Sequence, residues 1–201
     1  MLDSYKAKNK YNKYQVKLEK YISDKKLNNG VVYLKYCANL KMKADELERK
    51  KSLALYNYVN RIGKVDLKKV TSLIESGANI NAKFQDGVTL YMIAALNCQI
   101  EVLDLLKNQG ADIYAKTTFG QDALMLANLM KHKSNYSAKR VYLEVIRTLQ
   151  NHGLGKSLEV DNVGLTRDDY YLGNTDPFTN SYLKLIQKYM HEKTDGYVYT
   201  K

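Results

Sequence analysis

The chain of 201 residues contains little proline, cysteine or tryptophan. Its single proline, Pro177, favours long helices joined by short connections, because proline interrupts a helix interior. Its two cysteines, Cys37 and Cys98, are too few for a disulfide framework and favour a reducing compartment. A run of about 18 apolar residues is absent, as is the apolar core of a secretory signal peptide, which argues against a transmembrane helix and against secretion. These absences predict a cytoplasmic protein.

Positive charge is concentrated in the first quarter of the chain. Residues 1–51 carry 14 Lys and Arg against 6 Asp and Glu, whereas the other 150 residues carry 18 against 15. The N-terminal lysines spread around an expected amphipathic helix, and they are Lys6, Lys8, Lys10, Lys13, Lys17, Lys20, Lys25 and Lys26. Such a face either keeps the chain in solution or binds an acidic protein, nucleic acid or an anionic membrane. Arg49 is the only arginine in this stretch, which argues against recognition of base edges.

A seven-residue segment is repeated with a spacing of 33 residues. GANINAK, which begins at Gly77, returns as GADIYAK, which begins at Gly110. Between them, Asp86-Gly87 predicts a turn, because glycine tolerates positive φ. Thr89 is the expected N-cap of one helix, and Gly110 is expected to end a second, amphipathic helix. The repeated unit is therefore predicted to be a turn followed by two helices.

This unit resembles an ankyrin repeat. The residues that match the family pattern in unbroken register are Asp86, Gly87, Thr89, Ala94, Ala95, Glu101, Val102, Leu105, Gly110, Ala111, Asp112 and Ala115. Leu90 and Met92 stand where the family has proline and histidine, and Cys98-Gln99 stands where it has Gly-His. We expect these departures to weaken the unit without abolishing it. A truncated unit precedes it, and a unit with an insertion near residues 130–140 follows it.

The resemblance implies an all-α, short ankyrin-repeat solenoid with helical caps at both ends, because so few repeats cannot cover their own end faces. The expected regions are a basic helical N-terminal cap over 1–52, repeats over 53–154 (53–83, 84–116 and 117–154), and a C-terminal region over 155–201. Within the last region, residues 155–174 are expected to form a loop and 175–193 a capping helix. Asp66 is the expected N-cap of the second helix in the first repeat.

Motifs for catalysis or cofactor binding are incomplete or absent. GLGKS at 153–157 resembles the end of a phosphate-binding loop, but Gln150 replaces the earlier glycine that such a loop requires. His132, His152 and His191 lack metal-ligand spacing and suit positions near helix-end carbonyls. We therefore expect no enzyme activity, cofactor or metal. The alternative is an unfamiliar catalytic site within residues 31–50 and 155–174.

The resemblance also implies a function, namely protein–protein interaction through the hairpin tips and the concave helix face. An adaptor, an inhibitor and a bacterial effector in a host cytosol all fit this description, and an acidic partner suits the basic charge. The positions that map to this surface are Lys83, Phe84, Gln85, Val88, Leu96, Asn97, Lys116, Thr118, Phe119, Gln121, Leu129 and Met130.

Two aromatic residues of this set are expected either to bind a partner or to pack within the fold. Phe84 and Phe119 are expected to be exposed anchors at the hairpin tips, where aromatic side chains often dominate binding. Alternatively, both rings pack back on the neighbouring hairpin. A second hypothesis for function is electrostatic: the lysine-rich N-terminal helices bind nucleic acid or an anionic membrane, and the repeats serve as a scaffold.

Overall fold

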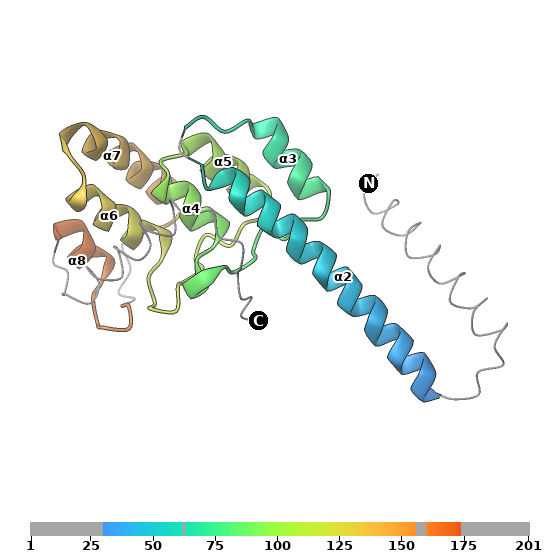
Figure 1. The fold of residues 1–201 in the computed structure, drawn as a ribbon. Helices are drawn as coiled ribbons and strands as arrows, with labels where there is room; N and C mark the ends of the chain where they lie inside the picture. Colours follow the sequence, from blue (N-terminus) through green and yellow to red (C-terminus); the bar gives the residue numbers. More distant parts are fainter. Residues whose placement is uncertain (1–29, 62, 156–159, 174–201) are drawn as a thin grey trace. The chain divides into compact units, whose positions relative to one another are not determined.

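The computed structural model describes residues 30–61, 63–155 and 160–173. Within these residues the chain forms seven α-helices and no β-strand, so the all-α prediction is confirmed (Figure 1). Contacts divide the chain into an N-terminal part, residues 1–47, and a C-terminal part, residues 48–201. The expected helices over 2–28 and 175–193 lie outside the described residues.

Helix α2 (Gly30–Val59) is the longest helix of the described residues. After Gly30 it contains neither glycine nor proline, so nothing in the sequence interrupts it. The division between the two parts falls inside this helix, between Leu47 and Glu48. From Glu48 onward α2 contributes Leu55, Tyr56 and Val59 to the hydrophobic core of the C-terminal part.

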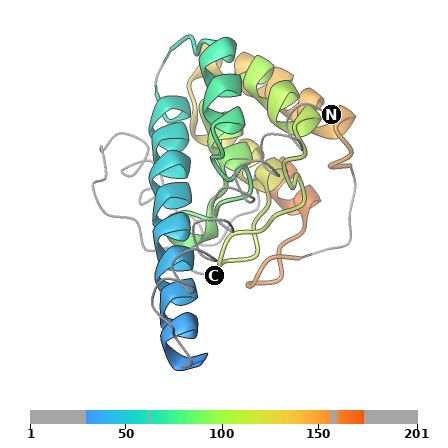
Figure 2. The same cartoon turned by 90° about the vertical axis from the view of Figure 1, so that its right-hand side faces the viewer.

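The helices of the C-terminal part form two rows. One row contains α4 (Leu90–Leu96), α6 (Ala123–Lys133) and α8 (Arg167–Leu172), in which α6 packs against both others. The other contains α3 (Leu67–Glu75), α5 (Ile100–Asn108) and α7 (Tyr136–Asn151), in which α5 packs against both others. Figure 2 looks along these rows, with α3 in front of α5 and α7. The core lies between the rows: every residue of α4 is buried, as are the first eight residues of α6.

Polar side chains cap the first helix of each unit. The Thr89 hydroxyl accepts a hydrogen bond from Met92 N at the start of α4. The Asp122 carboxylate accepts from the amides of the second and third residues of α6, and Thr166 forms a reciprocal capping box with Asp169 at the start of α8. The predicted cap at Asp66 is also confirmed, because its side chain accepts from Lys68 N at 2.9 Å. Such caps satisfy amides that have no partner inside the helix.

A tight turn precedes each of the helices α4, α6 and α8, and its closing bond recurs three times. The closing backbone bonds are Phe84 N to Val88 O at 2.8 Å, Thr117 N to Gln121 O at 2.9 Å and Asp161 N to Leu165 O at 2.9 Å. In the first turn this geometry includes the short 3₁₀ helix η1 (Gln85–Gly87). Each turn has a left-handed glycine at its fourth residue, with φ of 74°, 81° and 87° at Gly87, Gly120 and Gly164, and in the first turn Asp86 is left-handed as well, with φ of 57°.

The third of these turns corrects the sequence analysis. Residues 155–174 are expected to form a loop, but residues 160–172 instead contain a turn, the Thr166 cap and helix α8. The signal for this turn is present in the sequence, since Gly-x-Thr at 87–89 returns as Gly-x-Thr at 164–166. It is inconspicuous because α8 has only six residues and begins with Arg167 where α4 begins with Leu90.

Candidate interaction surface

The three turns stack on one another through their backbones. Thr118 N donates to Asp86 O at 2.8 Å, and at the corresponding position of the next turn Asn162 N donates to Phe119 O at 3.0 Å. The Asn162 side chain adds a bond from Nδ2 to Thr118 O at 2.7 Å. The Thr118 side chain adds another, because its hydroxyl donates to Asp86 O at 3.2 Å.

A second line of contacts joins the segments that follow each pair of helices. The Asn81 side chain accepts from Asp112 N at 2.7 Å and donates to Gly110 O at 3.4 Å, which links one repeated segment to the next. At the start of this line, Asn79 N donates to Ser52 Oγ at 2.8 Å. Asn79 and Asp112 occupy the same place in the two repeated segments, so equivalent positions hold neighbouring units together.

Six of the expected surface residues are buried, which corrects their expected exposure. They are Phe84, Val88, Leu96, Gln121, Leu129 and Met130. Phe84 is 3% exposed, and its ring centroid lies 4.2 Å from that of Tyr56 on α2, so it packs on this helix. Leu96, Leu129 and Met130 lie on the tightly packed pair of helices α4 and α6. Gln121 is buried because its Nε2 donates to Tyr170 Oη at 2.8 Å.

The other expected residues remain at the surface to different extents. Lys83 and Thr118 are exposed, whereas Gln85, Lys116 and Phe119 are half-buried. Asn97 is half-buried too, and its side chain donates to Val59 O at 3.3 Å, which gives it a structural role. Asn162 and Val163, which are not among the expected residues, are both exposed in the third turn. The alignment of Gly164 with Gly87 would have found them.

A buried ion pair lies where α6 meets α8. The Arg167 Nε donates to Asp122 Oδ2 at 2.7 Å, while Oδ1 of the same carboxylate caps α6. The Asp122 side chain is 0% exposed, so these partners and not solvent compensate its charge. Arg167 Nη1 also donates to Gly155 O at 3.0 Å, which connects the end of the preceding unit to α8. No sequence motif indicated this pair, because its members lie 45 residues apart.

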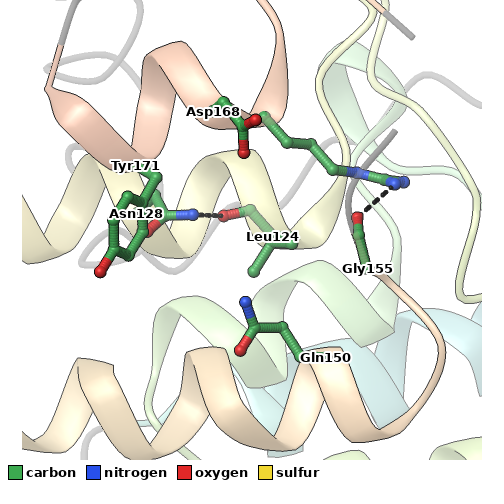
Figure 3. A pocket seen from close by; sticks show the side chains of 7 residues that line it. Leu124, Asn128, Gln150, Gly155, Asp168 and Tyr171 are labelled. Carbon is green, nitrogen blue, oxygen red and sulfur yellow. Dashed lines mark hydrogen bonds between the residues drawn. The ribbon is translucent and has the colours of Figure 1, made fainter. Parts of the chain in front are cut away.

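A cavity of about 270 Å³ lies beside this ion pair (Figure 3). Its lining residues are Leu124, Asn128, Gln150, Gly155, Arg167, Asp168 and Tyr171. The buried Asn128 donates from Nδ2 to Leu124 O at 3.1 Å, and its Oδ1 accepts from Lys131 Nζ at 3.4 Å. Because the buried polar side chains at this wall already bond within the protein, the cavity presents no set of groups that points to a ligand.

A hydrogen-bonded chain of three side chains joins α4, α5 and the end of α7. Tyr91 Oη lies 2.7 Å from His152 Nδ1, and His152 Nε2 lies 2.8 Å from Asp104 Oδ1. A neutral imidazole protonated at Nε2 satisfies both bonds. Burial raises the pKa of Tyr91 well above its usual value, and the Asp104 charge adds to this effect. His152 is expected near backbone carbonyls, but it instead lies between two side chains. By contrast, His132 does contact a carbonyl, with Nε2 2.8 Å from Tyr171 O.

Two further observations concern the classes of function. Among the described residues, no group of three or more His, Cys, Asp or Glu is arranged to hold a metal ion. In the same ranges, no helix combines the length and the apolar character needed to cross a bilayer. No family model matches the chain, and no curated protein matches it.

Proposed function

We propose that this chain is a non-enzymatic protein-interaction module of the ankyrin-repeat type, which binds a protein partner through the edge formed by its stacked turns. The observation that carries the proposal is the repeated turn, in which closing bond, glycine and helix cap recur in register three times. Repeated units of this kind present equivalent side chains at regular intervals along one edge, and such edges are commonly used to bind partners. An adaptor, an inhibitor or an effector in a cytoplasmic compartment fits this activity.

The side chains offered by the edge follow from the burial pattern. Lys83, Thr118 and Asn162 are exposed, and the half-buried Gln85 and Phe119 lie between them along the turns. The buried Phe84 serves the fold and is not available as an anchor. The proposed contact surface is therefore polar and partly basic, with Phe119 as its aromatic member.

The test is a pull-down with the full chain and a pair of charge-matched variants. Lys83→Glu/Thr118→Glu alters the turn edge, whereas Lys107→Glu/Gln109→Glu makes the same change of charge at exposed positions at the C-terminal end of α5. We expect the wild type and the α5 variant to retain one discrete protein at moderate salt, and the turn variant to lose it. Equal retention by both variants would remove the turn edge from consideration.

A further inference from the structure

Residues 52–201 have a local concentration of positive charge that their overall composition hides. Residues 131–147 contain five Lys and Arg and a single acidic residue, Glu144. The rest of residues 52–201 contains 13 Lys and Arg against 14 Asp and Glu, which is close to neutral. The net positive charge of this region therefore comes from the end of α6, the connection after it and α7.

One face of α7 carries this charge in a regular pattern. Tyr136, Arg140, Leu143 and Arg147 follow one another at intervals of four, three and four residues, which places them in a single row along the helix. We call this row the α7 stripe. All four residues are exposed, Tyr136 at 81% and Leu143 at 39%. Figure 1 shows α7 on the side of the C-terminal part away from the turns, so the stripe is a different surface from the turn edge.

Packing of the fold does not require the α7 stripe. The core face of α7 is formed by Tyr142, Val145, Ile146 and Leu149, which are all buried. On the exposed face, Glu144 is the only acidic residue of the helix, and the Arg167–Asp122 ion pair lies outside α7. Lys139 adds a further positive charge close to Lys131. The pKa of Lys131 is lowered mainly by burial and to a smaller extent by the charge of Lys139.

The composition of the stripe indicates the chemistry of its partner. Arginine binds carboxylates through two parallel hydrogen bonds, and exposed tyrosine and arginine are the residues that most often dominate protein interfaces. The apolar Leu143 lies between the two arginines, where a phosphate backbone would give it nothing to contact. A lone tyrosine and leucine also provide too little apolar area for insertion into a bilayer.

We propose that the α7 stripe binds an acidic protein segment that carries an aromatic or aliphatic anchor. The arginines would pair with the carboxylates, and Tyr136 and Leu143 would cover the anchor. The proposal rests on the proposed function in that the partner is a protein, but it assigns a second surface. The two surfaces can therefore be tested separately.

The experiment measures binding of short fluorescent peptides to the full chain by anisotropy. The first peptide alternates glutamates with phenylalanines, the second replaces the phenylalanines by serine, and the third replaces the glutamates by lysine. We expect the first peptide to bind, the second to bind about tenfold more weakly, and the third not to bind. A DNA duplex and vesicles with anionic lipid serve as competing probes, and tighter binding of either would overturn the proposal.

Variants locate the binding on α7. We expect Arg140→Ala/Arg147→Ala and Tyr136→Ala/Leu143→Ala each to weaken binding of the first peptide about tenfold. The charge-matched control Lys64→Ala/Lys107→Ala removes two exposed lysines elsewhere. This control is expected to change the affinity for the first peptide by less than about twofold. Equal weakening by all variants would mean non-specific attraction and would overturn the proposal. The turn variant Lys83→Glu/Thr118→Glu should bind the peptide as the wild type does. If the peptide does not bind to the α7 stripe, the pull-down test of the turn edge is therefore unaffected.

Discussion

The segments 87–110 and 120–153 begin and end alike but differ in length. Each runs from a left-handed glycine in a turn, through two helices, to a second left-handed glycine. Helices α4 and α5 have seven and nine residues, whereas α6 and α7 have eleven and sixteen. The added residues lengthen both helices and leave the turns and caps in register. The comparison teaches that the turn edge sets the repeat, while the two helices that follow each turn are free to lengthen and to acquire new surface, such as the α7 stripe.

The same two segments differ in the chemistry of their helix starts. Thr89 caps α4 with a neutral hydroxyl, and Leu90 beside it is buried in the core. Asp122 caps α6 with a buried carboxylate that needs Arg167 from the next unit as its partner. One position of the repeat is thus a local cap in the first segment and a link between units in the second.

The largest expected effect comes from removing this link. Asp122→Ala deletes two helix-cap bonds and leaves the Arg167 guanidinium buried without its carboxylate. We expect the free energy of unfolding to fall by about 3 to 5 kcal/mol. The matched change in the other segment, Thr89→Ala, should cost only about 1 kcal/mol. Urea unfolding of the full chain measures both.

A double substitution separates the charge from the cap. Asp122→Thr/Arg167→Leu converts the second segment to the chemistry of the first and should recover most of the lost stability, because well-packed apolar residues can replace a buried ion pair. If Asp122→Ala costs no more than Thr89→Ala, the ion pair is not a significant link between the units.

A smaller effect is expected from filling the space between stacked turns. A Cβ at Gly120 would lie 2.8 Å from Asn162 Oδ1 and 3.0 Å from Asn162 N, whereas one at Gly164 would meet no atom of the described residues within 4 Å. In both alanine variants the new residue must adopt an unfavourable left-handed φ, which lowers the free energy of unfolding by about 1 to 2 kcal/mol. Gly120→Ala should cost roughly 1 to 3 kcal/mol more than Gly164→Ala because of the close contact. Equal melting temperatures for the two variants would show that the stack accommodates the methyl group freely.

Local features of this fold are predictable from the sequence, while its packing is largely not. The cap at Thr89 and the glycine at Gly110 follow from residue type and spacing, because caps and left-handed positions need only neighbouring residues. The burial of Phe84 depends on Tyr56, which lies 28 residues earlier on another helix. From its position in the hairpin alone, the Phe84 ring is expected at the surface. Its burial in the core follows from the tertiary contact with Tyr56.

The candidate surfaces show the same limit. Lys83 and Thr118 are exposed, as expected for charged and polar residues at turn tips, although the Thr118 hydroxyl also donates to Asp86 O of the neighbouring turn at 3.2 Å. Gln121 carries an equally polar side chain, but its bond to Tyr170 on α8 buries it. Counted over residues 1–51 and 52–201, the basic charge belongs to the N-terminal region. A count over such long ranges hides the positive charge of residues 131–147, which a count over these residues alone reveals.

The smallest expected effect concerns the connections between the helices. Cys98 lies between α4 and α5 in the left-handed region, with φ of 55°, at the place where the resembling family has glycine. Burial raises the pKa of its thiol, and a hydrogen bond with Tyr142 partly offsets this. Cys98→Ala removes the thiol and keeps the strained φ, whereas Cys98→Gly removes both. We therefore expect the glycine variant to be more stable than the alanine variant by about 1 kcal/mol in urea unfolding.

Ser134, in the connection of the longer segment, has an extended backbone with φ of −88°. Glycine there should be less stable than alanine, because it only adds freedom to the unfolded chain. If both connections rank the two residues in the same order, the left-handed strain at Cys98 does not contribute to stability.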